Sequence, residues 1–291
     1  MAFVAFFATY PLAMYIFALL LGLVIGSFLN VVIYRLPIMM QREWTEQCHE
    51  FLELEATTAP TGPEKFNLAT PNSHCPGCKN EITALENIPV LSYLIQGGKC
   101  RHCQTRISLR YPLIEAFTGI TSVLVVTIFG FSWLCLAALI LTWSLIALSM
   151  IDIDHQLLPD DITLPLLWLG ILLNTFNLLT SLEAAVIGAM AGYLVLWLLY
   201  RIFKLATGKE GMGQGDFKLL AALGAWLGWQ ALPQIIFLSA IVGTMIGIAM
   251  ILFQGRDKNI PIPFGPYLAG AGFISLLWGD SVQQLYNSLL M

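Results

Sequence analysis

The chain has 291 residues, of which 57% are hydrophobic and 11% are charged, and its mean hydropathy is +0.76. Soluble domains carry about 25% charged residues, so this composition excludes an ordinary soluble enzyme and predicts an all-α polytopic membrane protein. The expected surroundings are a lipid bilayer, and nucleic acid is not an expected partner. The formal net charge of −4 adds little to this prediction.

Long apolar runs divide most of the chain into candidate membrane helices. A helix needs about 20 residues to cross about 30 Å of hydrocarbon. Runs of this kind predict about eight spans, near residues 11–34, 112–130, 132–151, 162–180, 183–203, 217–231, 233–253 and 262–290. Because the run 217–231 is short and weakly separated from the next one, six or seven spans stay open. The first run has no basic flank before it, so we expect no cleavable signal peptide.

The basic residues predict the orientation. If eight spans alternate with the N-terminus outside, all 14 Lys and Arg residues lie in or beside the segments 35–111, 152–161, 204–217 and 254–261. The positive-inside rule then places these segments in the cytoplasm. We therefore expect a first transmembrane helix at 1–34, a small cytoplasmic insert at 35–111 containing a loop at 56–72, and a core of about seven transmembrane helices at 112–291.

The insert contains two Cys-x-x-Cys pairs, in "HCPGC" and "CRHC". Such pairs are typical of a tetrahedral zinc site with four thiolate ligands, here Cys75, Cys78, Cys100 and Cys103. A closed site of this kind has no open position for water, so its role should be structural.

Two disulfides, or four unrelated thiols, are the alternatives to zinc. Disulfides are disfavoured because the insert is expected in the cytoplasm, where thiols stay reduced. Cys48 and Cys135 lie outside the pattern and are interpreted as ordinary thiols. His74 and His102 adjoin the pairs, but four cysteines already complete a zinc shell.

Several acids follow the third expected span in "IDIDHQLLPDD". Asp160 and Asp161 precede the fourth span, where acids suit the dipole and free amides of a helix start. Asp154 lies in the turn between the spans. Asp152 ends a helix, where the dipole disfavours a carboxylate, so another group must stabilise it or use it.

A second acid, Asp216, lies in "GMGQGDFKLL" at the start of a later span. It can cap its helix or serve a function. The glycines, including Gly213 and Gly215, favour a function because they permit positive φ and close backbone approach. A phosphate-binding loop is the weaker alternative, because no strand precedes the glycines and no GK[ST] follows them.

Asp152 and Asp216 are expected at the same membrane face, which is the arrangement an aspartyl hydrolase needs. Two carboxyls that share one site hold one proton between them. The charged carboxyl activates water, and the protonated one polarises the carbonyl.

Two further charged residues, Glu115 and Lys218, can each be interpreted in two ways. Glu115 lies about one turn inside the second span and either contributes to a site or pairs with a base such as Arg110. Lys218 either lowers the pKa of Asp216 or anchors the helix end.

Six ordered segments resemble the type IV prepilin peptidases, which are bifunctional leader peptidases and N-methyltransferases of bacterial inner membranes. They are "GSFLNVVIYRLP" (26–37), the two cysteine pairs, "NIPVLSYL" (87–94), "RYPLIEAFTG" (110–119), "IDIDHQLLPD" (151–160) and "GMGQGDFKLLAALGAWLG" (211–228). The Gly-x-Gly-Asp element is similar to that of a wider group of intramembrane aspartyl proteases.

The resemblance implies that Asp152 and Asp216 are the catalytic pair, because the first family aspartate stands seven residues before a proline, here Pro159. It implies type IV prepilin and type II secretion pseudopilin substrates, cut after a glycine between a basic leader and an apolar helix at the cytoplasmic face of the inner membrane. Asp154, Asp160, Asp161 and Glu115 are candidates to bind the leader's basic residues.

The resemblance also implies methylation of the new N-terminus with S-adenosylmethionine. In this family the region around "GGKCRHC" is tied to methylation, which points to Gly98. No Rossmann-type glycine pattern is visible. The sequence does not indicate the oligomeric state.

Two other classes of function stay open at this point. In an ion-coupled transporter, membrane acids carry charge, but such sites usually lie at mid-membrane and these acids gather at one face. A zinc-bearing scaffold explains the cysteines but leaves Asp152, Asp216 and the glycines unexplained.

Overall fold

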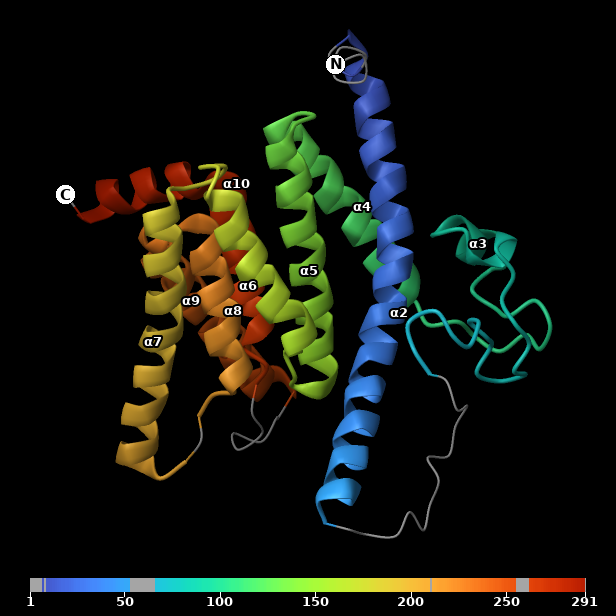
Figure 1. The fold of residues 1–291 in the computed structure, drawn as a ribbon. Helices are drawn as coiled ribbons and strands as arrows, with labels where there is room; N and C mark the ends of the chain where they lie inside the picture. Colours follow the sequence, from blue (N-terminus) through green and yellow to red (C-terminus); the bar gives the residue numbers. More distant parts are fainter. Residues whose placement is uncertain (1–6, 8, 53–65, 210, 255–261, 291) are drawn as a thin grey trace. The chain divides into compact units, whose positions relative to one another are not determined.

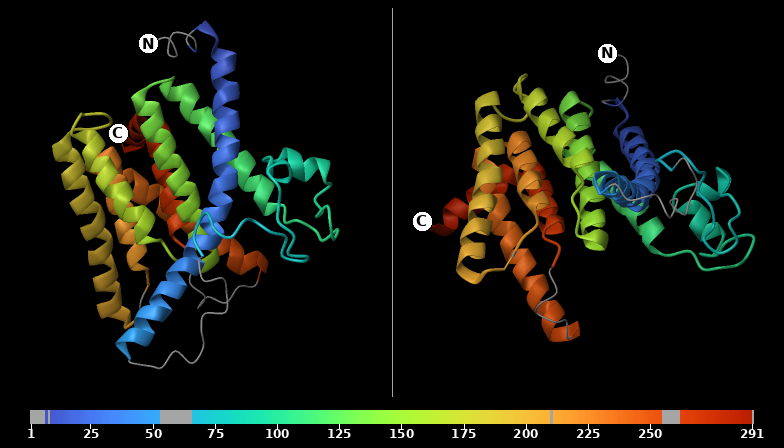
Figure 2. Two further views of the ribbon diagram at one scale, coloured as in Figure 1. Left: turned by 45° about the vertical axis from the view of Figure 1, so that its right-hand side comes forward. Right: turned by 60° about the horizontal axis from the view of Figure 1, so that its bottom comes forward.

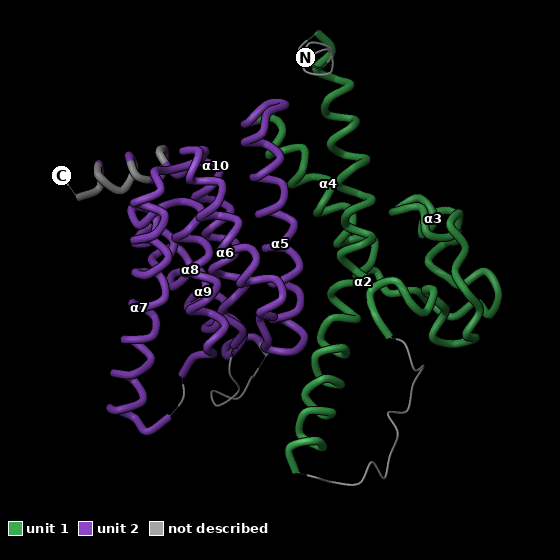
Figure 3. Tube along the Cα trace, in the orientation of Figure 1, with its two compact units in different colours: residues 1–127 green, residues 128–291 purple. Residues whose placement is uncertain are grey.

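The computed structural model describes residues 7, 9–52, 66–209, 211–254 and 262–290. The regular elements of these residues are all helices (Figure 1). They form two compact units, Met1–Thr127 (unit 1) and Ile128–Met291 (unit 2) (Figure 3). Residues 56–65 of the expected loop, and the basic residues Lys65, Arg256 and Lys258, lie outside the described part.

The described residues of unit 1 form two long helices and two short ones, and the end of α4 extends just past the boundary of the unit. They are α2 (Pro11–Phe51), the 3-10 helix η1 (Leu85–Asn87), α3 (Leu91–Ile95) and α4 (Arg110–Phe129).

Where the structure describes unit 2, it is a bundle of six α-helices with one short 3-10 turn. They are α5 (Trp133–His155), α6 (Asp160–Asn174), α7 (Leu182–Thr207), α8 (Gln214–Leu227), η2 (Trp229–Ala231), α9 (Leu232–Gln254) and α10 (Gly265–Leu290).

The prediction of an all-helical membrane protein is confirmed, and each of the eight apolar runs forms a helix. Within the described ranges, five helices are long and apolar enough to cross a membrane: α2, α4, α5, α7 and the segment Trp229–Phe253. By contrast, α6 has 15 residues and α8 has 14, which is less than the about 20 needed. The helical backbone of α10 is interrupted at Trp278 (φ −134°). The number of spans therefore stays a prediction.

Helix α2 continues far beyond the apolar run that predicts it. Its 41 residues measure about 61 Å at 1.5 Å per residue, roughly twice the thickness of the hydrocarbon core. The chain stays helical past residue 34 because the end of an apolar run does not itself stop a helix. The division into three domains stays a prediction.

Local signals explain where the helices of unit 2 begin and end. The side chains of Ser132 and Ser181 accept hydrogen bonds from amides in the first turns of α5 and α7, which satisfies donors that have no partner within the helix. Gly208 ends α7 with a φ of 70° and Gly228 ends α8 with a φ of 82°, a conformation that suits glycine.

Helix α8 forms the centre of unit 2. It packs against α7, α6 and α10 (Figure 1), and every residue from Phe217 to Trp226 is buried except Lys218. A helix that is apolar on all sides is stable only when other helices surround it. This central position fixes the start of α8, where Asp216 lies.

The contact between α7 and α8 requires glycine. A Cβ on Gly188 would overlap the carbonyl of Gly224, and a Cβ on Gly192 would lie 2.6 Å from the carbonyl oxygen of Leu220. These contacts are with backbone, which cannot turn aside as a side chain can. Small residues allow this close packing of membrane helices.

Gly188→Ala should therefore push α7 away from α8. Overpacking costs about 1–3 kcal/mol, so the thermal unfolding midpoint of the purified protein in detergent should fall by several degrees. The matched control is Gly270→Ala, at an exposed helical glycine whose added Cβ would meet nothing within 4 Å. Equal midpoints for the two variants would show that this helix contact is not close-packed.

Candidate active site and metal centre

Asp152 lies in the last turn of α5 and is buried, with 5% of its surface exposed. Its Oδ2 accepts a hydrogen bond of 2.9 Å from the backbone N–H of Gly265, the first residue of α10. The amides at a helix start favour a negative charge. The group that stabilises a carboxylate at the unfavourable end of α5 is therefore the start of α10.

Asp216 is the third residue of α8 and is 6% exposed. Its side chain reaches back to accept a hydrogen bond from the backbone N–H of Gly213, the residue that caps α8. This is the acid half of a capping box. Asp216 therefore caps its own helix, as one of the two open interpretations expected.

The two aspartates belong to one site within unit 2, where their carboxyls are close enough to interact electrostatically. Leu158 packs between the helices that carry the site: a Cβ added to Gly215 would lie 2.7 Å from the Cβ of Leu158, and one added to Gly265 would lie 3.1 Å from its Cδ2. The end of α5 and the starts of α8 and α10 thus meet around Leu158. Two buried carboxyls brought together in this way can share a proton and activate a water.

Of the two glycines before Asp216, Gly215 is required for close approach, and neither has positive φ. Gly213 has an extended backbone (φ −76°), and Gly215 is not among the residues with positive φ. An added Cβ at Gly215 would strike Leu158, so the missing side chain lets α8 approach the turn that follows α5. Of the two expected properties, close approach therefore applies at Gly215, whereas a Cβ at Gly213 would make only an ordinary contact of 3.7 Å with Oδ2 of Asp216.

Lys218 anchors α8 through a different acid. Its Nζ lies 2.7 Å from both carboxylate oxygens of Asp160, in the first turn of α6. Of the two interpretations of Lys218, the structure favours the anchor. Asp161 is also exposed in the first turn of α6, where it suits the helix dipole. Asp154 is exposed at the end of α5.

Glu115 lies in α4, which begins in unit 1, whereas both aspartates belong to unit 2, and its surface is 8% exposed. Its Oε2 accepts a hydrogen bond of 2.8 Å from the backbone N–H of Val90, and its carboxylate also bonds the side chain of Ser27. Glu115 therefore connects α4 to the "NIPVLSYL" segment of the insert.

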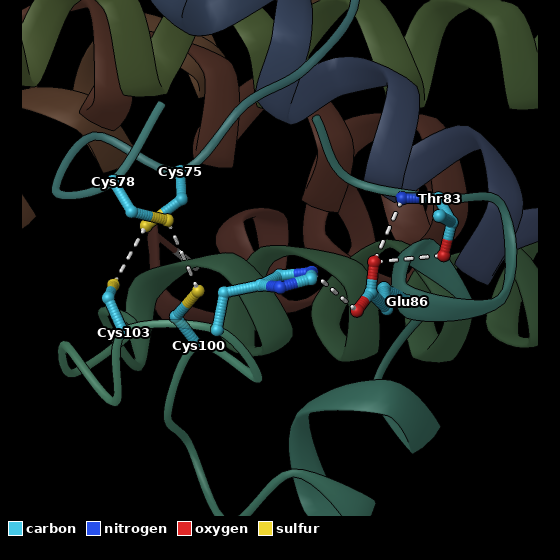
Figure 4. Close-up of polar contacts among 7 residues, drawn as sticks. Cys75, Cys78, Thr83, Glu86, Cys100 and Cys103 are labelled. Atoms are coloured by element: carbon cyan, nitrogen blue, oxygen red, sulfur yellow. Dashed lines mark hydrogen bonds and ion pairs between the residues drawn. The ribbon is translucent and has the colours of Figure 1, made fainter. Parts of the chain in front are cut away.

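The four cysteines of the insert converge on one point (Figure 4). All four sulfurs lie within 4.8 Å of one another. The distance is 3.6 Å from Cys75 to Cys103 and 4.0 Å from Cys78 to Cys100. A tetrahedron with Zn–S bonds of about 2.3 Å has sulfurs roughly 3.8 Å apart, so the cluster fits an ion of this size.

Two nearly equivalent turns present these sulfurs. In the first, the N–H of Lys79 donates to the carbonyl of Cys75, and in the second, the N–H of Gln104 donates to that of Cys100, both at 2.9 Å. Lys79 (φ 61°) and Gln104 (φ 58°) take the same left-handed conformation. An antiparallel bridge flanks each turn, His74 with Glu81 and Lys99 with Arg106.

The two turns give the thiols different pKa values, so the thiols differ in how readily they ionise to bind a metal. Hydrogen bonds from Thr105 lower the pKa of Cys103 to about 6. At Cys78 a backbone hydrogen bond from Asn80 lowers the pKa, but burial and the neighbouring sulfurs outweigh it and raise the pKa to about 11. Backbone hydrogen bonds from Cys78 and Gly77 lower the pKa of Cys75.

The histidines beside the cysteines lie outside the cluster, as expected. His102 Nε2 lies 3.9 Å from Oε1 of Glu86, whose Oε2 also accepts hydrogen bonds from the backbone N–H and the hydroxyl of Thr83 (Figure 4). The Thr83 backbone N–H is the main reason that the pKa of Glu86 is lowered. His74 Nδ1 is 3.3 Å from the carbonyl oxygen of Asn72.

Gly98 follows α3 and is buried, with a φ of 69°. An added Cβ would lie 2.7 Å from the hydroxyl of Tyr93. The conformation and the ring contact together explain why glycine is required at this position, so Gly98 does not by itself mark a cofactor contact.

Sequence reasoning missed two residues that connect the parts of these sites. Gly265 holds Asp152, and its only sequence signal is a Gly-Pro pair at the start of an apolar run. Arg35 was counted only as a basic residue beside the membrane. It is 7% exposed, and its guanidinium donates to the carbonyls of Asn67, Leu68 and Pro71, which attaches the insert to α2.

Comparison with known proteins supports this organisation. Residues 20–129 match the model of the bacterial peptidase A24 N-terminal domain, and residues 139–248 match that of the type IV leader peptidase family. These matches fall almost entirely on unit 1 and on unit 2, respectively. No solved structure matches the chain.

Curated relatives cover nearly the whole chain. It is 57% identical over 283 residues to a prepilin leader peptidase/N-methyltransferase of Stutzerimonas stutzeri, with 97% of each chain covered. It is 53% identical over 281 residues to the protein of that name from Pseudomonas aeruginosa, covering 97% of this chain and 96% of the relative. For the protein of that name from Neisseria gonorrhoeae the identity is 51% over 270 residues, covering 93% and 92%. With both family matches in order and this coverage, the chain belongs to the type IV leader peptidase family.

Proposed function

We propose that the protein cleaves the leader from type IV prepilins and type II secretion pseudopilins and then N-methylates the new N-terminal residue. The observation that carries the peptidase half is the pair of buried aspartates, Asp152 and Asp216, whose carboxyls interact where the ends of three helices meet. The relatives' name, prepilin leader peptidase/N-methyltransferase, supports both halves.

In the proposed mechanism the two carboxyls divide the work of hydrolysis. One carboxyl is charged and takes a proton from the attacking water, while the other is protonated and donates a hydrogen bond to the scissile carbonyl. The N–H of Gly265 orients the carboxyl of Asp152, and the N–H of Gly213 orients that of Asp216. Because backbone amides of two helix starts hold both groups, the pair is arranged before substrate arrives.

The position of the pair suits a substrate that is itself a membrane helix. Asp152 ends a helix long enough to cross the membrane, so the scissile bond is proposed to lie at the cytoplasmic edge of the inner membrane. A basic leader that passes this edge needs acids beside it. Asp154, Asp160 and Asp161 are all exposed in this region, and Asp160 also pairs with Lys218.

Zinc is proposed to bind the four cysteines and to hold the two turns of the insert together. The sulfur spacing fits the ion, and four thiolates leave no position for a substrate, so the role is structural. S-adenosylmethionine is the proposed methyl donor, on the strength of the relatives' name alone.

Asp152→Asn and Asp216→Asn should each abolish cleavage of a purified prepilin in detergent. Removing a general acid or base costs about 10²–10⁴-fold in rate, and each variant should lose at least that much while its unfolding midpoint stays close to wild type. Glu183→Gln, at an exposed acid in the first turn of α7, is the control and should cleave normally. Cleavage that survives either Asn substitution would remove that aspartate from the pair. A transporter or a scaffold would not cleave in any form.

Charge reversal at Asp154 or Asp161 should raise KM for a prepilin with its basic leader more than it lowers kcat. With a leader whose Lys and Arg are replaced by Gln, the same variants should match wild type, because the attraction they remove is then absent. Steady-state kinetics on the two substrates measures the difference. An equal effect on both substrates would show that these acids do not bind the leader's charges.

Zinc uptake by the metal-free protein at pH 7 should release protons. Cys103, with a pKa of about 6, is largely ionised, but Cys78, with a pKa of about 11, must lose its proton to become a ligand. Affinity should therefore rise with pH, and titration calorimetry in two buffers of different ionisation enthalpy counts the protons. Cys75→Ser should lose the zinc while Cys48→Ser, at an exposed cysteine outside the cluster, should retain it. Uptake without proton release would contradict the assigned thiol states.

A further inference from the structure

The turn before α3 holds an unusual backbone conformation. Val90 has a φ of 60° and a ψ of −47°, and the N–H of Leu91 donates to the carbonyl of Pro89 at 2.6 Å. This is a γ-turn of the rare, strained form. A β-branched residue takes positive φ only when its surroundings impose it, and such strain often marks a functional segment.

A buried carboxylate holds this turn in place. Glu115 accepts the N–H of Val90 at 2.8 Å and also bonds Ser27 of α2. Glu115 lies five residues after Arg110, where α4 begins, which is about 7.5 Å along a helix that is long enough to span the membrane. The turn is therefore fixed beside the first turns of a membrane helix and not beyond its end.

Helix α3 follows the turn and lies near the start of α4 in both views of Figure 2. Its side chains divide into two sets. Tyr93 packs over Gly98 and faces inward, whereas Leu91, Leu94 and Ile95 are 57%, 66% and 83% exposed. Three large apolar side chains at this spacing form one helix face, which is exposed and follows directly on the turn that Glu115 of α4 holds.

The positive charges near this face indicate which kind of partner it binds. Lys99 and Arg106 are exposed and paired by a backbone bridge just after α3. An apolar helix face flanked by cations is the pattern of an interfacial helix on anionic lipid. The same cations would repel a basic leader, which disfavours the substrate as the occupant.

We propose that α3 is a lipid-docking element, whose face of Leu91, Leu94 and Ile95 enters the headgroup region of the bilayer and whose depth is set by the hydrogen bond from Val90 to Glu115. The contact of α3 with lipid then holds the insert against the membrane, in addition to the chain connections of the insert to α2 and α4. This inference does not depend on the proposed reaction, because docking precedes substrate.

Depth-dependent fluorescence quenching in the full-length protein tests the proposal. A fluorescent amino acid is incorporated at Ile95 or, as control, at Ala84, an exposed residue of the same insert outside α3. The protein is reconstituted into vesicles containing anionic lipid, with and without lipids that carry a nitroxide near the headgroup. We expect loss of emission at position 95 and none at position 84, without any substrate.

Two variants test the role of Glu115 in the same assay. Glu115→Ala should reduce the quenching at position 95, and Glu115→Gln, which keeps an acceptor oxygen, should preserve it. If Glu115→Ala does not fold, the comparison of positions 95 and 84 in the otherwise unaltered protein still decides the matter. Equal emission at the two positions, with and without nitroxide lipid, would overturn the proposal. A second result would also overturn it: emission at position 95 that is the same with and without nitroxide lipid but changes when prepilin is added. That result would show that the face binds substrate.

Discussion

The hydrogen bond from the N–H of Gly265 to Asp152 is the contact on which the candidate active site depends. A carboxylate at the C-terminal end of α5 meets the unfavourable end of that helix's dipole, and burial adds to the cost of its charge. The start of α10 supplies the compensating amide.

The remaining features of unit 2 position the second carboxyl against the first. Glycines on α7 and α8 let these helices approach so closely that α8 is enclosed, and Gly215 lets its start reach Leu158. The ion pair between Lys218 and Asp160 also ties the start of α8 to the start of α6. In unit 1 too, buried side chains bind backbone groups of distant segments. Arg35 donates hydrogen bonds to carbonyls of residues 67–71, and Glu115 accepts one from the N–H of Val90.

Composition, periodicity and motif spacing were enough to predict the helices, the converging cysteines and the two aspartates as a pair. These depend on local patterns, since an apolar run specifies a helix and a Cys-x-x-Cys turn specifies where its sulfurs point. The partners could not be predicted in the same way. Gly265 acts through its backbone N–H, and an added Cβ would lie 2.7 Å from Oδ2 of Asp152. A glycine at a helix start does not by itself indicate which distant side chain approaches it.

The length of α2 and the role of Glu115 escaped prediction for related reasons. The helix continues past the apolar run because polar residues such as Gln41, Glu43 and Glu46 form helices as readily as apolar ones, and hydropathy reports only where the apolar run stops. Glu115 was expected to pair with a charge or to join the leader site, but its carboxylate accepts a backbone amide of the insert. A sequence shows which side chains carry charge, while the backbone groups that satisfy them emerge only from the fold.

The pH dependence of kcat/KM for prepilin cleavage tests the central claim, that the two carboxyls act as one unit with one proton. The substrate should carry a leader without titratable groups, so that the profile reports the enzyme. The account predicts a bell-shaped profile, because activity requires one carboxyl charged and the other protonated. A profile that falls on one side only would show a single titrating group and would contradict the shared-proton site.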